Sequence, residues 1–137
     1  MLVVEVLDSK AARYKKMVVK TARWLVRRFK KGGFYVEVVL VGDKTMKKNV
    51  YSYPAKKGFP YPGIKQKPLG EIYLNPSFIG KEKITFGTED LALPTKLNYM
   101  LIHGFLHLLG YDHIKKNDTI TMERLEHKLL AELSKTK

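Results

Sequence analysis

The feature that most constrains the fold is residues 34–41, an almost uninterrupted apolar segment with the sequence Phe-Tyr-Val-Glu-Val-Val-Leu-Val. Aromatic and β-branched residues favour a strand, and Gly42-Asp43 directly after them predicts a turn. Such continuous apolar character is typical of a strand that is covered on both faces. We therefore expect a sheet packed against helices.

The segment before it, residues 10–31, contains ten basic residues and no acidic one. Its apolar residues recur at three- and four-residue steps, which predicts an amphipathic helix with one buried stripe. Ser9 is the expected N-cap, and Gly32-Gly33 is expected to end the helix. The stripe consists of Tyr14, Met17, Val18, Thr21, Ala22, Leu25, Val26 and Phe29.

The rest of the chain predicts strands over residues 2–7, 50–53 and 71–75, a short helix-like stretch over 44–48, and a proline-rich loop over 54–68. Helices are expected over residues 91–109, with Pro94 in the first turn, and from about 118 to 133. The buried side of the last helix should comprise Ile120, Met122, Leu125, Leu129, Leu130 and Leu133. The order β-α-β-β-β-α-α predicts an α+β fold, a single domain over residues 1–137 with a mixed four-stranded sheet packed against helices.

The chain is strongly basic, with 26 Lys and Arg against 13 Asp and Glu, a net charge of +13 and an isoelectric point near 9.8. This imbalance favours a polyanionic partner such as a nucleic acid. The chain has no cysteine, which excludes thiol nucleophiles, Cys-type zinc fingers, iron–sulfur clusters and disulfide scaffolds. We find no targeting or membrane-spanning segment and expect a cytoplasmic protein.

Three of the four histidines lie within eleven residues, at positions 103, 107 and 113. His103 and His107 are four apart on a predicted helix, so both imidazoles project from one face. Gly110 allows the chain to leave the helix in a left-handed conformation, so that His113 turns back toward them. Three neutral imidazoles leave the fourth tetrahedral position open, as in catalytic zinc sites, so we expect one Zn²⁺ per chain on this helix and the following loop.

A peptidase pattern, His-Glu-x-x-His-x-x-Gly-x-x-His, has the same ligand spacing and the same glycine. Gly104 stands where that pattern places the glutamate that acts as general base. Its absence disfavours peptide hydrolysis. His127, on the final helix, is expected at the surface and is assigned no role.

Residues 103–113 resemble the signature of the YbeY family of metal-dependent endoribonucleases, His-Gly-x-Leu-His-Leu-x-Gly-Tyr-Asp-His, at every fixed position. Further similarities are Val50-Tyr51-Ser52-Tyr53-Pro54, Leu69-Gly70-Glu71-Ile72, and Met122 with Glu126. The resemblance implies a zinc-dependent endoribonuclease that acts in ribosomal RNA maturation and ribosome quality control. It also implies that His103, His107 and His113 are the zinc ligands.

The sequence departs from the family at one place. The family has a segment with an arginine ahead of the Val-x-Ser-x-Pro strand, and in this chain that segment is shortened and the arginine is missing. Here the chain passes from Met46 directly through Lys47, Lys48 and Asn49 to Val50. Lys47 or Lys48 is the candidate replacement for substrate binding, although a lysine lacks the bidentate phosphate geometry of arginine. Asp112 either orients a ligand histidine or is simply a turn residue after Gly110.

Two other functions remain open. One is a metal-dependent hydrolase of another substrate, and the other is a non-catalytic RNA-binding factor in ribosome assembly. The expected partners are ribosomal RNA and, with it, ribosomal proteins or assembly GTPases, without a membrane. The sequence does not indicate an oligomeric state.

Overall fold

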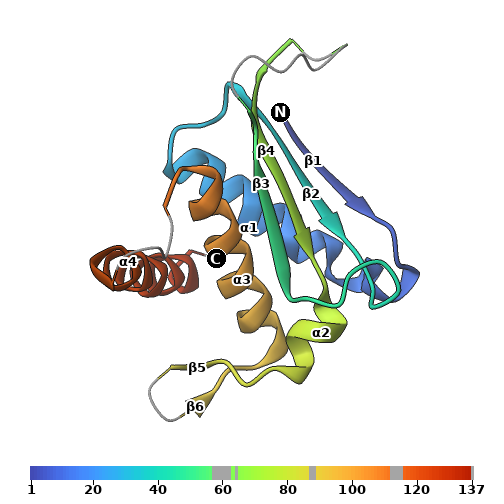
Figure 1. Cartoon of the computed structure of the whole chain (residues 1–137), viewed down its shortest axis with the longest axis vertical. Helices are drawn as coiled ribbons and strands as arrows, with labels where there is room; N and C mark the ends of the chain where they lie inside the picture. The colour runs from blue at the N-terminus through green and yellow to red at the C-terminus, as the bar shows by residue number, and fades with distance from the viewer. Residues whose placement is uncertain (57–62, 64, 87–88, 112–115, 137) are drawn as a thin grey trace.

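The computed structural model describes residues 1–56, 63, 65–86, 89–111 and 116–136. Within these residues, four strands form the main sheet, two α-helices pack on it, and a small hairpin, one 3₁₀ helix and two further α-helices are the remaining elements (Figure 1). In chain order the elements are β1 (Leu2–Val6), the 3₁₀ helix η1 (Ser9–Tyr14), α1 (Lys15–Arg28), β2 (Phe34–Leu40), β3 (Val50–Pro54), β4 (Lys67–Leu74), α2 (Pro76–Lys81), β5 (Thr85–Phe86), β6 (Glu89–Asp90), α3 (Leu93–Leu108) and α4 (Lys116–Ser134).

The main sheet has the strand order β1-β2-β4-β3. β1, β2 and β4 are parallel, and β3 is antiparallel to β4 at the sheet edge. In the register Val38 pairs with both Val4 and Ile72, and Ile72 also pairs with Ser52. The predicted mixed four-stranded sheet and the α+β class are confirmed.

Helices α1 and α3 cover one face of this sheet, and α4 packs on the outer side of α3 (Figure 1). Alternate residues of β2 point toward these helices, and Val36, Val38 and Leu40 are completely or almost completely buried. On the opposite face Tyr35 and Glu37 are only half-buried, whereas Val39 is buried. The expectation that β2 is covered on both faces is therefore wrong for its first half.

The amphipathic helix is present, but its ends differ from those predicted. Asp8, not Ser9, is the N-cap of η1, because its carboxylate reaches forward and accepts a hydrogen bond from the Lys10 N–H. Helix α1 ends at Arg28, ahead of the two glycines, because Lys30 already adopts a positive φ of 55°. The buried residues of α1 are Val18, Thr21, Ala22 and Leu25, which belong to the predicted stripe.

Three further local predictions differ from the structure. Residues 44–48 do not form a helix: residues 43–45 form a turn, closed by hydrogen bonds from the Thr45 and Met46 N–H groups to the Gly42 carbonyl, and a bend follows at 47–49. Helix α2 and the β5–β6 hairpin lie between the strand expected over residues 71–75 and the helix expected over 91–109, where we predicted no element. Ile120 is 43% exposed, so it lies off the buried side of α4.

Within the described ranges, none of the helices combines the length and the apolar character that a membrane crossing requires.

Candidate metal centre

The two histidines of α3 converge as their spacing predicts. The Nε2 atoms of His103 and His107 are 3.1 Å apart, and the ring centroids are 4.6 Å apart. The two rings are nearly perpendicular, at 77°. One turn of helix therefore brings two imidazole nitrogens to the same point.

Glu126 of α4 fixes the orientation of His103 from behind. Its Oε2 lies 2.5 Å from His103 Nδ1, and its Oε1 accepts a hydrogen bond of 3.1 Å from the Tyr99 hydroxyl. Glu126 is only 1% exposed, so its charge is stabilised mainly by these two contacts. When His103 Nδ1–H donates to this carboxylate, Nε2 carries the lone pair and faces His107.

The Tyr99 hydroxyl is suited to remain a donor in this arrangement. Burial, together with the neighbouring Glu126 carboxylate, raises the pKa of Tyr99 well above its ordinary value. Tyr99 lies one turn before His103 on α3, so both residues reach the same carboxylate. The result is a buried chain from Tyr99 through Glu126 to His103.

Gly104 lies where α3 packs directly against β3 and β4. A Cβ atom at this position would lie 2.9 Å from Ser52 Oγ, 3.0 Å from Ile72 Cγ2 and 3.2 Å from Val50 Cγ2. The Ser52 hydroxyl also donates to the Gly104 carbonyl at 2.9 Å. A glutamate here would enter the sheet, and so the peptidase base has no room at this position.

The histidines open into a cavity of about 620 Å³ between β3 and the second half of α3. Lys48 lines this cavity, and its Nζ lies 4.3 Å from the centroid of the Tyr51 ring. Lys47 is exposed and does not line the cavity. Of the two candidate lysines, the structure therefore brings only Lys48 to the histidines.

The glycine that follows α3 has the predicted conformation, since Gly110 has a φ of 102°. The third expected ligand, His113, and the candidate second-layer residue, Asp112, lie outside the described residues. Within the described part of the chain, no group of three His, Cys, Asp or Glu residues is arranged to hold a metal ion. His127 is exposed, as expected, and its ring lies 6.1 Å from that of Tyr99.

Sequence reasoning assigned no role to Tyr99 or Glu126. A signal was available, because Glu126 follows Met122 by four residues and precedes Leu129 by three, and so occupies the apolar face of α4. A carboxylate on a buried helix face requires a partner, so this position was recognisable as a polar residue with a structural or functional role.

The fold and this site together define a small α+β protein with a pair of converging histidines on the helix that packs against its sheet. The family model described as endoribonuclease YbeY matches residues 5–134. The chain therefore belongs to the YbeY family.

Curated relatives are consistent with this assignment. The chain is 48% identical over 65 residues to the endoribonuclease YbeY of Anaplasma marginale strain Florida. This alignment covers 47% of this chain and 40% of that protein. It is 29% identical over 135 residues to the endoribonuclease YbeY of Thermodesulfovibrio yellowstonii, covering 92% and 78%. The chain spans less than half the length of the curated relatives that it matches first: 40% of the Anaplasma marginale protein and 46% of the Pseudoalteromonas translucida protein.

A solution structure from Thermotoga maritima shares the fold. It aligns with a TM-score of 0.59 and 22% sequence identity, over 98% of this chain and 92% of that chain. This likeness concerns the architecture alone.

Proposed function

We propose that this protein is a zinc-dependent endoribonuclease that acts in ribosomal RNA maturation. The observation that carries the proposal is the convergence of His103 Nε2 and His107 Nε2 at 3.1 Å in a chain of the YbeY family. Membership of the YbeY family supports the endoribonuclease activity, and the histidine pair supports a metal site.

The donor set present in the structure suits zinc. Two imidazole nitrogens converge on one point, and a buried carboxylate engages the far nitrogen of one of them, as is common for histidines that bind metals. We assign His103, His107 and, by family resemblance, His113 as the ligands of one Zn²⁺. When bound, the ion would supply Lewis acidity toward a phosphodiester and toward its nucleophile.

The residues of this chain position the ligand histidines and bind the substrate. Glu126 keeps the proton of His103 on Nδ1, and Tyr99 holds the other oxygen of that carboxylate. Ser52 ties α3 to β3 through the Gly104 carbonyl, which fixes the floor of the cavity. Lys48, at the cavity wall, is the cation that binds the phosphodiester of the substrate.

Lys48 takes the place that we assign to the arginine of the shortened family segment. A lysine provides a point charge without a planar fork of donors, so the phosphate is bound but less strictly oriented. We therefore expect Lys48→Gln to lower kcat/KM for RNA cleavage by about 10-fold or more, the loss of one charge-assisted hydrogen bond. Lys47→Gln, one residue away and outside the cavity, is the matched control and should have little effect.

The deciding experiment measures zinc content by elemental analysis in the parent protein and in His103→Ala, His107→Ala and His113→Ala, and then incubates each with structured ribosomal RNA. We expect about one zinc in the parent and loss of zinc and of cleavage together in the variants. A full zinc content in His107→Ala would contradict the ligand assignment. Zinc without metal-dependent cleavage would overturn the nuclease proposal.

The alternative is an RNA-binding factor in ribosome assembly that keeps zinc for its structure, which the shortened segment favours. Chelation separates the two, because removal of a structural ion lowers the melting temperature strongly, whereas removal of a catalytic ion abolishes turnover more than folding. The family resemblance extends the proposal to ribosome quality control in the cytoplasm. It also extends it to ribosomal proteins or assembly GTPases as partners.

A further inference from the structure

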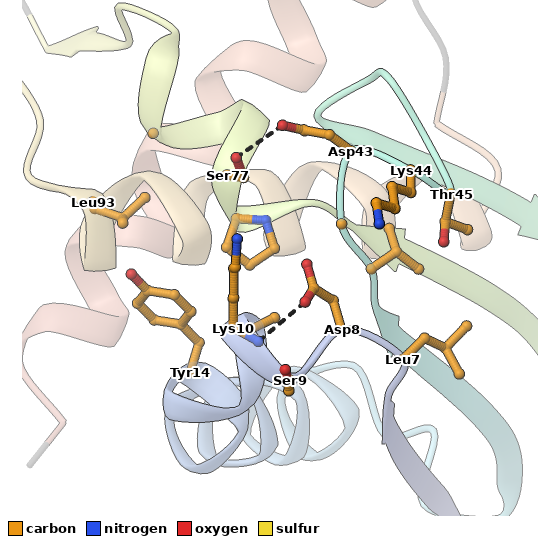
Figure 2. A pocket seen from close by; sticks show the side chains of 15 residues that line it. Leu7, Asp8, Ser9, Lys10, Tyr14, Asp43, Lys44, Thr45, Ser77 and Leu93 are labelled. Carbon is orange, nitrogen blue, oxygen red and sulfur yellow. Dashed lines mark hydrogen bonds between the residues drawn. The ribbon is translucent and has the colours of Figure 1, made fainter.

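A second cavity, of about 730 Å³, lies at the carboxyl ends of the three parallel strands. Its walls are the segments that follow β1, β2 and β4, together with Tyr14 and Leu93 (Figure 2). We call it the carboxyl-edge pocket. It contains none of the histidines, and its size is within the range of small-molecule sites. In open sheets with parallel strands, this edge is where ligands commonly bind.

The pocket offers two ammonium groups that the fold does not use. Lys10 rises from η1 between Tyr14 and Asp8, and Lys44 lies across from it on the loop after β2 (Figure 2). Both side chains are exposed, and neither forms an ion pair within the described residues.

The two carboxylates of the pocket are already occupied. Asp43 accepts hydrogen bonds from Asn75 Nδ2, Ser77 Oγ and Lys81 Nζ, at 2.9, 3.1 and 3.3 Å. Asp8 accepts the Lys10 N–H at 3.1 Å as the cap of η1. Lys81 pairs with Asp43, whereas Asp8 keeps its charge, so Lys10 and Lys44 exceed the remaining carboxylate by one positive charge.

One wall of the pocket is aromatic and apolar. The Tyr14 ring is partly buried and lines the pocket together with Leu93 (Figure 2). The Arg13 guanidinium lies 5.6 Å from the centroid of the Tyr14 ring. Pro76 and Ala11 continue this wall. Such a surface accepts a flat ring, while the lysines accept an anion.

We propose that the carboxyl-edge pocket binds a nucleotide, with Lys10 and Lys44 on its phosphate and Tyr14 beside its base. The site is separate from the histidines, and its existence does not depend on the nuclease activity proposed above.

The test titrates the protein, residues 1–137, with adenosine monophosphate by isothermal titration calorimetry. In Lys10→Gln/Lys44→Gln we expect affinity to fall by about tenfold or more, since two charge-assisted hydrogen bonds are lost. Lys128→Gln/Lys135→Gln, which removes the same charge from exposed positions near the end of the chain, should bind like the parent. Adenosine should bind much more weakly than the monophosphate.

A second variant blocks the pocket without removing charge. A Cβ at Gly80, a residue of the pocket wall, would lie 3.6 Å from Leu93, an ordinary contact, so Gly80→Leu adds a side chain at the pocket without a clash of its Cβ atom. It should lose nucleotide binding and keep the parent melting temperature. His107→Ala should retain binding, which would separate this pocket from the candidate metal centre.

Several outcomes would overturn the proposal. They are no saturable binding by the parent protein, equal affinity in the two lysine variants, and equal affinity for adenosine and its monophosphate. Loss of binding in His107→Ala with retention in Lys10→Gln/Lys44→Gln would place the nucleotide at the histidines instead.

Discussion

At the scale of single residues, Glu126 is the side chain on which the geometry of the candidate site depends most. It is almost completely buried, and both of its oxygens accept from proton donors, the Tyr99 hydroxyl and His103 Nδ1–H. An amide offers only one acceptor oxygen. We therefore expect Glu126→Gln to weaken zinc binding by about 10- to 100-fold, as is typical when the partner of a ligand histidine is lost.

The measurement is a competition titration of zinc against a chelating dye. Glu123→Gln is the matched control, because it removes an exposed carboxylate from the same helix three residues earlier. Equal zinc affinity in the two variants would show that Glu126 does not position His103.

Gly104 allows a second prediction at this scale. A methyl group at this position would press on Ser52, Val50 and Ile72, and the latter two are β-branched and have little freedom to move. We expect Gly104→Ala to lower the free energy of unfolding by about 1–3 kcal/mol, the usual cost of overpacking. Urea denaturation measures this change. Gly32→Ala, where an added Cβ meets nothing within 4 Å, is the control, and a similar loss there would refute the packing argument.

Sequence reasoning reached the residues whose neighbours are local. The spacing of His103 and His107 fixes their approach within one helix, and Gly110 was recognisable as the residue with a positive φ after the helix end. Glu126 was different, because its partner depends on how α4 packs against α3. That contact joins positions 23 residues apart, and no local rule specifies it.

At the scale of elements, the face of the main sheet opposite α1 and α3 brings carboxylates together. Glu37 on β2 lies between β1, which carries Glu5, and β4, where Glu71 is its register partner. Burial, followed by the charges of Glu5 and Glu71, raises the pKa of Glu37 above its ordinary value. Because the folded state disfavours the ionised form, this group's contribution to stability is fully present below its ordinary pKa of 4.5 and is lost as the pH rises through the folded-state value.

Glu37→Gln should therefore raise the free energy of unfolding at pH 7 by about 0.2–1 kcal/mol, the range for cross-strand pairs. At pH 3, where the carboxyl is protonated in both states, the difference should disappear. Urea unfolding at the two pH values measures it. A stabilisation that is equal at both pH values would show that charge is not the cause.

Elements with strong periodicity were predictable, whereas those held by tertiary contacts were not. The main strands and the three long helices follow their apolar patterns. The β5–β6 hairpin has only two residues per strand, and the buried Lys96 anchors it by donating to the Glu82 carbonyl and pairing with Asp90. A buried lysine on α3 is not foreseeable from a local pattern, and neither is a hairpin that depends on it.

At the scale of the whole molecule, the net charge of +13 is unevenly distributed. Helix α1 has no acidic residue, whereas α4 interleaves its cations with four, namely Asp118, Glu123, Glu126 and Glu132. An RNA backbone would therefore meet only basic charges among the ionisable side chains of α1, of which Arg28 is paired with Glu132.

RNA affinity should thus depend steeply on salt and specifically on α1. A protein that neutralises six phosphates loses about 10³-fold in affinity between about 50 and 200 mM salt. Lys16→Gln/Lys20→Gln/Arg23→Gln removes three exposed charges of α1, and each lost phosphate contact should lower the slope of log K against log salt by about 0.7–0.9. Arg124→Gln/Lys128→Gln/Lys135→Gln removes three exposed charges from the C-terminal end of the chain and should change the slope little.

Fluorescence anisotropy with a labelled RNA measures both slopes. Equal slopes in the two variants would mean that RNA affinity depends on the total charge of the protein and not on helix α1. A parent slope near zero would mean that the basic charge does not serve to bind RNA.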